Sequence, residues 1–418
     1  MSATRLSIAA SLMLAFAFAG CGSPAPQFRR YETYALKVEK AKEVEFKEEQ
    51  RADIDLTLAA FFGTPDDPAL PALADVDPAT VMNLPLLKMS AGKVGSDELN
   101  RPEGLYREHC AHCHGVTGDG AGPTAAFLNP YPRDYRKGWF KFKSTKVGTK
   151  PTHDDLKKIL LEGIPGTAMP SFKLLTDQEV ESLVHYVKYL AIRGETERKL
   201  LEYAADLEPD ARLVSVPGEK SSAEERAAAV EQIDAVKTIV TDIVSAWATS
   251  AESLTSAPVS ARPETTEAEL AESQKRGREL FYGAVANCAK CHGDSALGDG
   301  QLTDYDEWTK EFMDASDPAA IQDYVALGLP EPRNIRPRNL RQGVFRGGMR
   351  PLDIYWRIRN GIEGTPMPAA SMKIEGDANS KGLTENDIWD IVNYVQSLPY
   401  ESISDPRQAD PINARERM

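Results

Sequence analysis

The chain has 418 residues, a formal net charge of −14 and 42% hydrophobic residues. This length allows about three domain-sized units of roughly 150 residues each. Only one stretch, near the N-terminus, is strongly apolar, which excludes a protein with several membrane spans and fits a soluble exported protein. We expect no nucleic acid among its partners.

Residues 1–20 have the pattern of a bacterial export signal. Arg5 gives a short basic start, and the apolar run 8–18 is too short to span a membrane. The following Phe-Ala-Gly-Cys at 18–21 resembles the end of a lipoprotein signal, although Phe18 stands where Leu is more usual. We expect cleavage before Cys21, acylation of its sulfur and anchoring at the periplasmic face of a bacterial membrane. The alternative is ordinary cleavage, which would release a free periplasmic protein.

Residues 21–90 are predicted to form a tether and an N-terminal arm. The tether is Gly-Ser-Pro-Ala-Pro at 22–26, and residues 30–60 are charge-rich with helical character. The arm is either a solvated spacer or a segment that docks on a membrane partner, and the sequence leaves both open.

Two C-x-x-C-H motifs carry the chemistry, and they occupy residues 110–114 and 288–292. This motif attaches c-type haem: the two cysteines bond the porphyrin, and the histidine supplies an axial nitrogen. Zinc is the alternative for paired cysteines, but here each pair runs directly into histidine. Four of the five cysteines go to haem and Cys21 to lipid, so none remains for a disulfide. We therefore expect two covalently attached haem c groups.

A methionine follows each motif in the same setting. Met169 and Met367 each lie in Gly-Thr-x-Met-Pro, six residues after a glycine that ends a helical pattern. The residue before proline favours extended geometry, which helps to hold a thioether against the iron. His/Met pairing is typical of electron-transfer cytochromes. The alternative is that these are core methionines.

The sequence contains six histidines, which limits the candidates for axial ligands. The second half of the chain contains only His292, so its haem cannot take two histidines from its own domain. Met349 and Met372 are weaker competitors of Met367. In the first half, His109 and His112 flank the attachment site and are expected to face solvent, while His153 and His185 lie on predicted helices.

The segments around the two motifs repeat in the same order, which predicts domains at 91–194 and 267–402. Each contains a leading helix, a Pro-Arg-Asp or Pro-Arg-Asn segment, and a helix that ends at Gly163 or Gly361. A last helix follows the methionine, and Thr176 with Glu179 forms a capping-box pattern at its start in domain one. Domain two carries an insertion at 302–328 that covers the haem edge or forms a partner surface.

Residues 195–266 are predicted to be an acidic helical linker. Residues 223–247 form a strong helix candidate with an apolar stripe. This stripe packs against a haem domain or docks on another subunit. Residues 403–418 are expected to be a frayed tail.

These motifs resemble class I c-type cytochromes, in tandem and of lipoprotein type. The resemblance implies a mainly α fold, with two cytochrome c domains joined by the acidic linker and preceded by the signal and helical arm. It implies first and last helices that cross, and arginines near the haem propionates. The implied site residues are the thioether cysteines Cys110, Cys113, Cys288 and Cys291, proximal His114 and His292, distal Met169 and Met367, and possible propionate contacts Arg133 and Arg338.

The expected function is transfer of single electrons between respiratory-chain partners, without catalysis by the chain itself. An iron with both axial positions filled has no place for a substrate. The partners would be a membrane respiratory complex or a soluble carrier, with the membrane reached through the lipid anchor. Two alternatives stay open: a di-haem peroxidase-type enzyme with one open haem, and a cytochrome c subunit of a membrane oxidoreductase complex.

Overall fold

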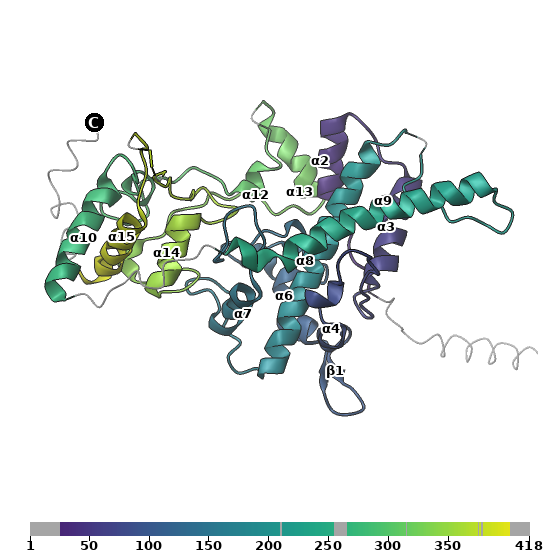
Figure 1. The fold of residues 1–418 in the computed structure, drawn as a ribbon, viewed down its shortest axis with the longest axis horizontal. Coiled ribbons are helices and arrows are strands. Elements are labelled where there is room, and N and C mark those ends of the chain that lie inside the picture. Colours follow the sequence, from purple (N-terminus) through teal and green to yellow (C-terminus); the bar gives the residue numbers. More distant parts are fainter. Residues whose placement is uncertain are drawn as a thin grey trace, which may run out of the picture.

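A computed structural model describes residues 26–209, 211–254, 266–314, 316–374, 376–377 and 379–401. The predicted signal, Cys21 and the tail at 403–418 lie outside this part of the chain. The fold is mainly helical, as expected (Figure 1). Within the described residues, β1 (Gly95–Ser96) and β2 (Pro102–Glu103) form an antiparallel pair. No helix in this part of the chain is both long enough and apolar enough to cross a membrane.

Domain one is built on the long helix α8 (Asp177–Ala205). Its other helices are α4 (Leu84–Ser90), α5 (Leu105–His109), α6 (Ala111–His114) and α7 (His153–Glu162). The predicted capping box is present, because Thr176 accepts from the amide of Glu179. The expected boundary at residue 194 falls inside α8, whose last turns bury Leu200 and Leu201.

The N-terminal arm forms α2 (Glu32–Lys42) and α3 (Glu48–Phe62). Both helices pack against α8, and the side chains of Tyr31 and Phe62 are 2% and 0% exposed. The Tyr31 amide donates to Oε1 of Glu197 at 2.6 Å, and the Tyr189 hydroxyl donates to the carbonyl of Phe62 at 2.5 Å. The interpretation as a solvated spacer is therefore wrong, because the arm shares the core of domain one.

The linker helix α9 (Ala223–Ala248) also belongs to domain one. Val236, Val240 and Val244 are buried against that domain, and Nε1 of Trp247 donates to Oε1 of Glu195 at 2.8 Å. Its N-terminal half projects away from the body of the protein, and Val230 there is 56% exposed (Figure 1). The stripe thus packs on a haem domain along its second half.

Domain two contains α10 (Glu267–Tyr282), α11 (Ala289–His292), α14 (Pro351–Asn360) and α15 (Glu385–Ser397). The expected crossing of first and last helices is present between α10 and α15. They cross at Gly277, where a side-chain carbon would lie 1.9 Å from the carbonyl oxygen of Asp390. Only glycine allows this close approach of the backbones.

Short 3₁₀ turns complete the chain, at η1 (Pro78–Thr80), η2 (Ala125–Phe127), η3 (Tyr135–Lys137), η4 (Ser250–Ser253), η5 (Pro318–Ala320), η6 (Leu340–Gln342) and η7 (Leu398–Tyr400).

The insertion of domain two contains α12 (Glu307–Lys310) and α13 (Ile321–Ala326), and it reaches domain one. Phe312, Ile321, Tyr324 and Leu329 form a small cluster against which Leu36 of the arm packs. Glu311 bonds Lys37 at 3.0 Å and Arg198 at 2.9 Å, and it also pairs with Lys137. The insertion therefore fastens domain two to the arm and to α8.

Further contacts join the two domains around the methionine loop of domain two. Lys143 pairs with Glu363, and both side chains are almost completely buried. The side-chain amide of Asn360 donates to the Ser144 carbonyl at 3.1 Å, and Lys158 pairs with Asp353. These contacts and those of Glu311 define the domain junction.

The Glu311 cluster gives a testable pH dependence. Burial raises the pKa of Glu311, but Lys137 and Arg198 outweigh it and hold the pKa at about 2. The unfolded pKa is about 4.3. The ionised Glu311 carboxylate therefore stabilises the folded protein fully above pH ~4.3, and this stabilisation is lost as the pH falls toward about 2.

Glu311→Gln should lower the free energy of unfolding by roughly 3–5 kcal/mol at neutral pH, because it leaves buried cations without their carboxylate. Urea unfolding at a series of pH values should show the wild-type and variant curves converging as the pH falls through this window. Asp323→Asn is the matched control, since it breaks the exposed pair with Lys40 between the same segments and should cost less than about 1 kcal/mol. Curves that stay parallel would contradict the assignment.

Candidate functional site

One continuous cavity of 1810 Å³ lies between the two domains. It is lined by both C-x-x-C-H motifs and by both methionine loops. Pockets for one small ligand are usually about 300–1,000 Å³. The volume and lining therefore fit two large groups placed side by side, and we call this space the shared cavity.

The histidine of each motif is oriented by the same backbone contact. Nδ1 of His114 lies 2.9 Å from the carbonyl oxygen of Arg133, and Nδ1 of His292 lies 3.0 Å from that of Arg338. A carbonyl can only accept, so each Nδ1 carries the proton and donates it. Burial lowers the pKa of both imidazoles, to about 4 for His114. Each histidine is thus neutral, and its Nε2 lone pair is available to a metal.

The four motif cysteines line the shared cavity as free thiols. They are Cys110, Cys113, Cys288 and Cys291. Burial raises the pKa of Cys110 and of Cys288 to about 12, so both are protonated thiols before any bond is made to them. In each domain one thiol at the N-cap of a short helix, with a second thiol and an imidazole inside that helix, fits covalent attachment of one haem.

The methionine loops are built by identical hydrogen bonds. In domain one the Thr167 hydroxyl donates to the Ile164 carbonyl at 2.8 Å and accepts from the Met169 amide at 3.1 Å. In domain two, Thr365 makes the same bonds to Ile362 and Met367, at 2.8 and 3.2 Å. The glycine before each threonine has φ +74° or +73°, which favours glycine. This explains why Gly-Thr-x-Met-Pro occurs twice.

The competing ligands are placed differently. Met349 is 55% exposed and Met372 packs on the core of domain two, and neither lines the shared cavity, whereas Met367 does. His112 is exposed, as predicted, but His109 is half-buried against the ring of Phe172.

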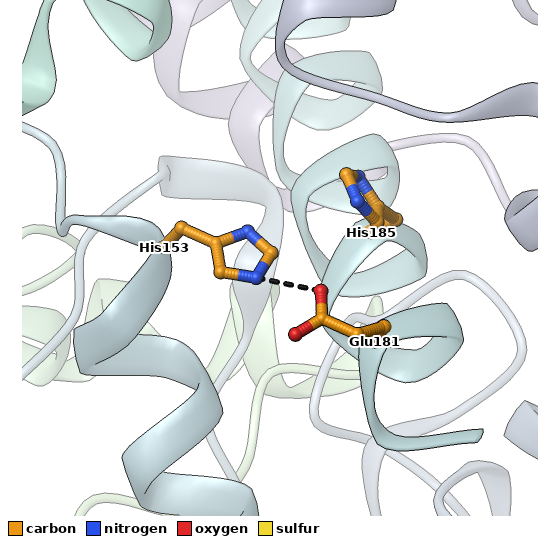
Figure 2. A group of neighbouring side chains, drawn as sticks. All are labelled: His153, Glu181 and His185. Atoms are coloured by element: carbon orange, nitrogen blue, oxygen red, sulfur yellow. Dashed lines mark ion pairs between the residues drawn. The ribbon is translucent and has the colours of Figure 1, made fainter. Parts of the chain in front are cut away.

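The two remaining histidines, His153 and His185, lie outside the shared cavity. They come together with Glu181 between α7 and α8 (Figure 2).

Basic side chains surround the shared cavity at the domain junction. A side-chain carbon at Gly364 would lie 3.2 Å from Nη1 of Arg133, and one at Gly166 would lie 2.8 Å from Nη2 of Arg338. Each arginine of the Pro-Arg segments therefore reaches the methionine loop of the other domain.

Two further cations line the cavity, and sequence reasoning missed them. Burial lowers the pKa of Lys141 to about 7, and it also lowers the pKa of Arg346. Lys141 stands in the aromatic run Gly-Trp-Phe-Lys-Phe at 138–142, and such a run was the available signal that this lysine is buried. A negative charge in the cavity would favour the protonated, positively charged forms of these two side chains, so the cavity wall is suited to anionic groups.

Comparison with known proteins identifies both halves of the site. Residues 97–187 match the family "Cytochrome C oxidase, cbb3-type, subunit III", and residues 274–399 match the family "Cytochrome c". No curated protein sequence matches the chain. Among solved structures, a chain of the Kuenenia stuttgartiensis reducing HAO-like protein complex is 23% identical with a TM-score of 0.42. That alignment covers 73% of this chain and 99% of the other.

The threonine of the methionine loop offers a test of the site. Thr365→Val removes both hydrogen bonds of the hydroxyl, which should cost roughly 1–2 kcal/mol of loop stability. Stopped-flow mixing of the oxidised haem protein with imidazole should therefore show displacement of Met367, the proposed ligand, about 5–30-fold faster than in wild type. Thr365→Ser keeps the hydroxyl and should behave like wild type. Equal rates for valine and serine would show that these bonds do not hold the loop.

Proposed function

The chain is a tandem c-type cytochrome with two covalently bound haem c groups, and we propose that it transfers single electrons between redox partners. Each haem, when bound, supplies a one-electron couple. The protein residues would hold its two axial positions, and they join the two sites in one cavity.

The observation that supports this proposal best is the equivalence of the two ligand sets. Each half places a neutral histidine with a free Nε2 and a braced methionine on the same cavity. We propose His114 with Met169 in domain one, and His292 with Met367 in domain two, as the axial pairs. Two filled axial positions leave no place for a substrate, and methionine ligation favours the reduced state.

The shared cavity supports a relay within the chain. Both attachment motifs line one continuous space, and buried ion pairs such as Lys143–Glu363 hold the domains together around it. An electron taken up at one end of the protein can therefore pass to the other haem without a change of partner. Two independent carriers on a flexible linker would need no such junction.

We propose that Arg133 and Arg338 contact haem propionates at the domain junction. Both line the shared cavity, and each lies near the methionine loop of the opposite domain. A guanidinium suits a carboxylate because it donates two parallel hydrogen bonds. Lys141 and Arg346 would add positive charge to the same wall.

Location and partners form the finer part of the proposal. Acylation at Cys21 would anchor the protein at the periplasmic face of a bacterial membrane, where it would serve a respiratory complex or a soluble carrier. A permanent place in a membrane oxidoreductase complex would use the same chemistry with a fixed partner. A di-haem peroxidase would need one open iron, and the presence of a methionine loop in both domains argues against it.

Replacing either distal methionine tests the ligand assignment. Met169→Ala and Met367→Ala should each lower the reduction potential of one haem and open its sixth position. Titration of the reduced holoprotein with CO should then give one CO per chain in each variant and none in wild type. Met349→Ala is the control, because that side chain is exposed outside the cavity. CO binding to the wild-type protein would instead favour an enzyme with an open haem.

Charge at the domain junction should tune both potentials. Arg133→Gln and Arg338→Gln remove a cation that favours the reduced state, so redox titration should show lower potentials. Because each arginine lies between the two sites, we expect both haems to respond to either change. Arg133→Lys keeps the positive charge, so its potentials should lie close to those of the wild type. Arg101→Gln, on the surface of domain one, should leave both potentials unchanged. A shift confined to the haem of the same domain would contradict the cross-domain contact.

A further inference from the structure

Three side chains of metal-ligating type meet outside the shared cavity. Nε2 of His153 lies 2.8 Å from Oε2 of Glu181, and the rings of His153 and His185 are 5.4 Å apart. One possible ligand atom from each of the three residues lies within 4.8 Å of the other two (Figure 2). The chain has six histidines, and these are the two that do not belong to or flank an attachment motif. Their meeting is therefore not explained by haem binding.

The backbone fixes where these side chains start. Glu181 and His185 are four residues apart on α8, so they share one face of that helix. His153 is the first residue of α7, directly after the N-cap Thr152. Each of the two helices begins with a capping box, which fixes the residue at which the helix starts and so the positions of these three residues.

Hydrogen bonds outside the cluster turn the ligand atoms inward. Nδ1 of His185 lies 3.1 Å from the carbonyl oxygen of Val81 and 3.3 Å from the backbone nitrogen of Asn83. In the tautomer that donates to Val81, the proton is on Nδ1 and the Nε2 lone pair is free for a metal. Lys157 pairs with Oε1 of Glu181 at 2.7 Å, which leaves Oε2 toward the histidines. Metal-binding histidines usually donate their other ring nitrogen to a carbonyl or carboxylate in this way.

Domain two supplies an internal comparison. The same helices occur there without these residues: Pro351 stands at the position of His153, Trp389 at that of Glu181 and Asn393 at that of His185. The fold around a methionine loop therefore does not require the cluster. It is a feature of domain one alone.

We propose that His153, Glu181 and His185 bind a divalent transition-metal ion, for which Zn²⁺ is the probe. Two imidazoles and one carboxylate with an open fourth position form a known zinc donor set. Zinc bonds of about 2.0–2.1 Å place ligand atoms roughly 3.4 Å apart, so ligand atoms up to 4.8 Å apart need to close by up to about 1.4 Å. The side chains of His153 and Glu181 are 32% and 23% exposed, which leaves them room to move.

Such an ion would connect α7 to α8, the two helices on either side of the Met169 loop at 163–176. It would therefore brace the loop that carries the distal ligand of domain one. One local group opposes binding: Nζ of Lys188 lies 3.0 Å from Nδ1 of His153 and must turn away. In domain two, Gln396 stands at the position of Lys188.

The test is equilibrium dialysis of the purified holoprotein against Zn²⁺, with zinc and iron counted by elemental analysis. We expect one zinc per chain in addition to the two haem irons. His185→Asn and Glu181→Gln should each weaken zinc binding about 100-fold or more, since losing even an outer partner of a ligand costs 10–100-fold. Lys188→Gln should strengthen binding, because it removes the competing ammonium.

Asp154→Asn is the matched control. It removes one negative charge beside His153 without removing a ligand, so its zinc affinity should stay close to wild type. An unchanged haem spectrum shows that each variant is folded. Absence of bound zinc in the wild type would overturn the proposal, and so would binding that His185→Asn and Glu181→Gln leave unchanged.

Discussion

The two sites depend on one contact, made twice, from a motif histidine to the carbonyl of an arginine. This bond sets the tautomer of His114 and of His292 and leaves Nε2 available for the proposed axial position. The side chains of the same arginines, Arg133 and Arg338, extend to the methionine loop of the opposite domain. One residue thus orients the motif histidine of its own domain and approaches the methionine loop of the other. The sites are therefore joined both mechanically and electrostatically.

The rest of the structure keeps this junction closed. Glu311 of the insertion meets cations from the arm, from η3 and from α8, and Lys143 pairs with Glu363 inside the methionine loop of domain two. Buried pairs of this kind are costly to break because each would leave an uncompensated charge. A fixed distance between the two sites favours a relay, whereas domains on a flexible linker would exchange electrons irregularly.

The repeated motifs and the helices around them could be predicted because they depend on local pattern. C-x-x-C-H, Gly-Thr-x-Met-Pro and the capping box at Thr176 each concern a few neighbouring residues, and each is present in the structure. The helix at 223–248 also followed from its apolar stripe. The position of the arm could not be predicted from the sequence. Lys37 and Arg51 suggest a solvated surface until their partners Glu311 and Glu39 are known. The cross-domain reach of Arg133 likewise depends on residues more than two hundred positions away.

The most direct test of this account is electron paramagnetic resonance of the fully oxidised holoprotein, compared with the half-reduced state. If both haems occupy the shared cavity, their spins interact, so the oxidised spectrum should be broadened. Reduction of one haem should then sharpen the signal of the other to that of an isolated low-spin centre. An oxidised spectrum that equals the sum of two independent centres would contradict the account, because it would place the haems in separate crevices.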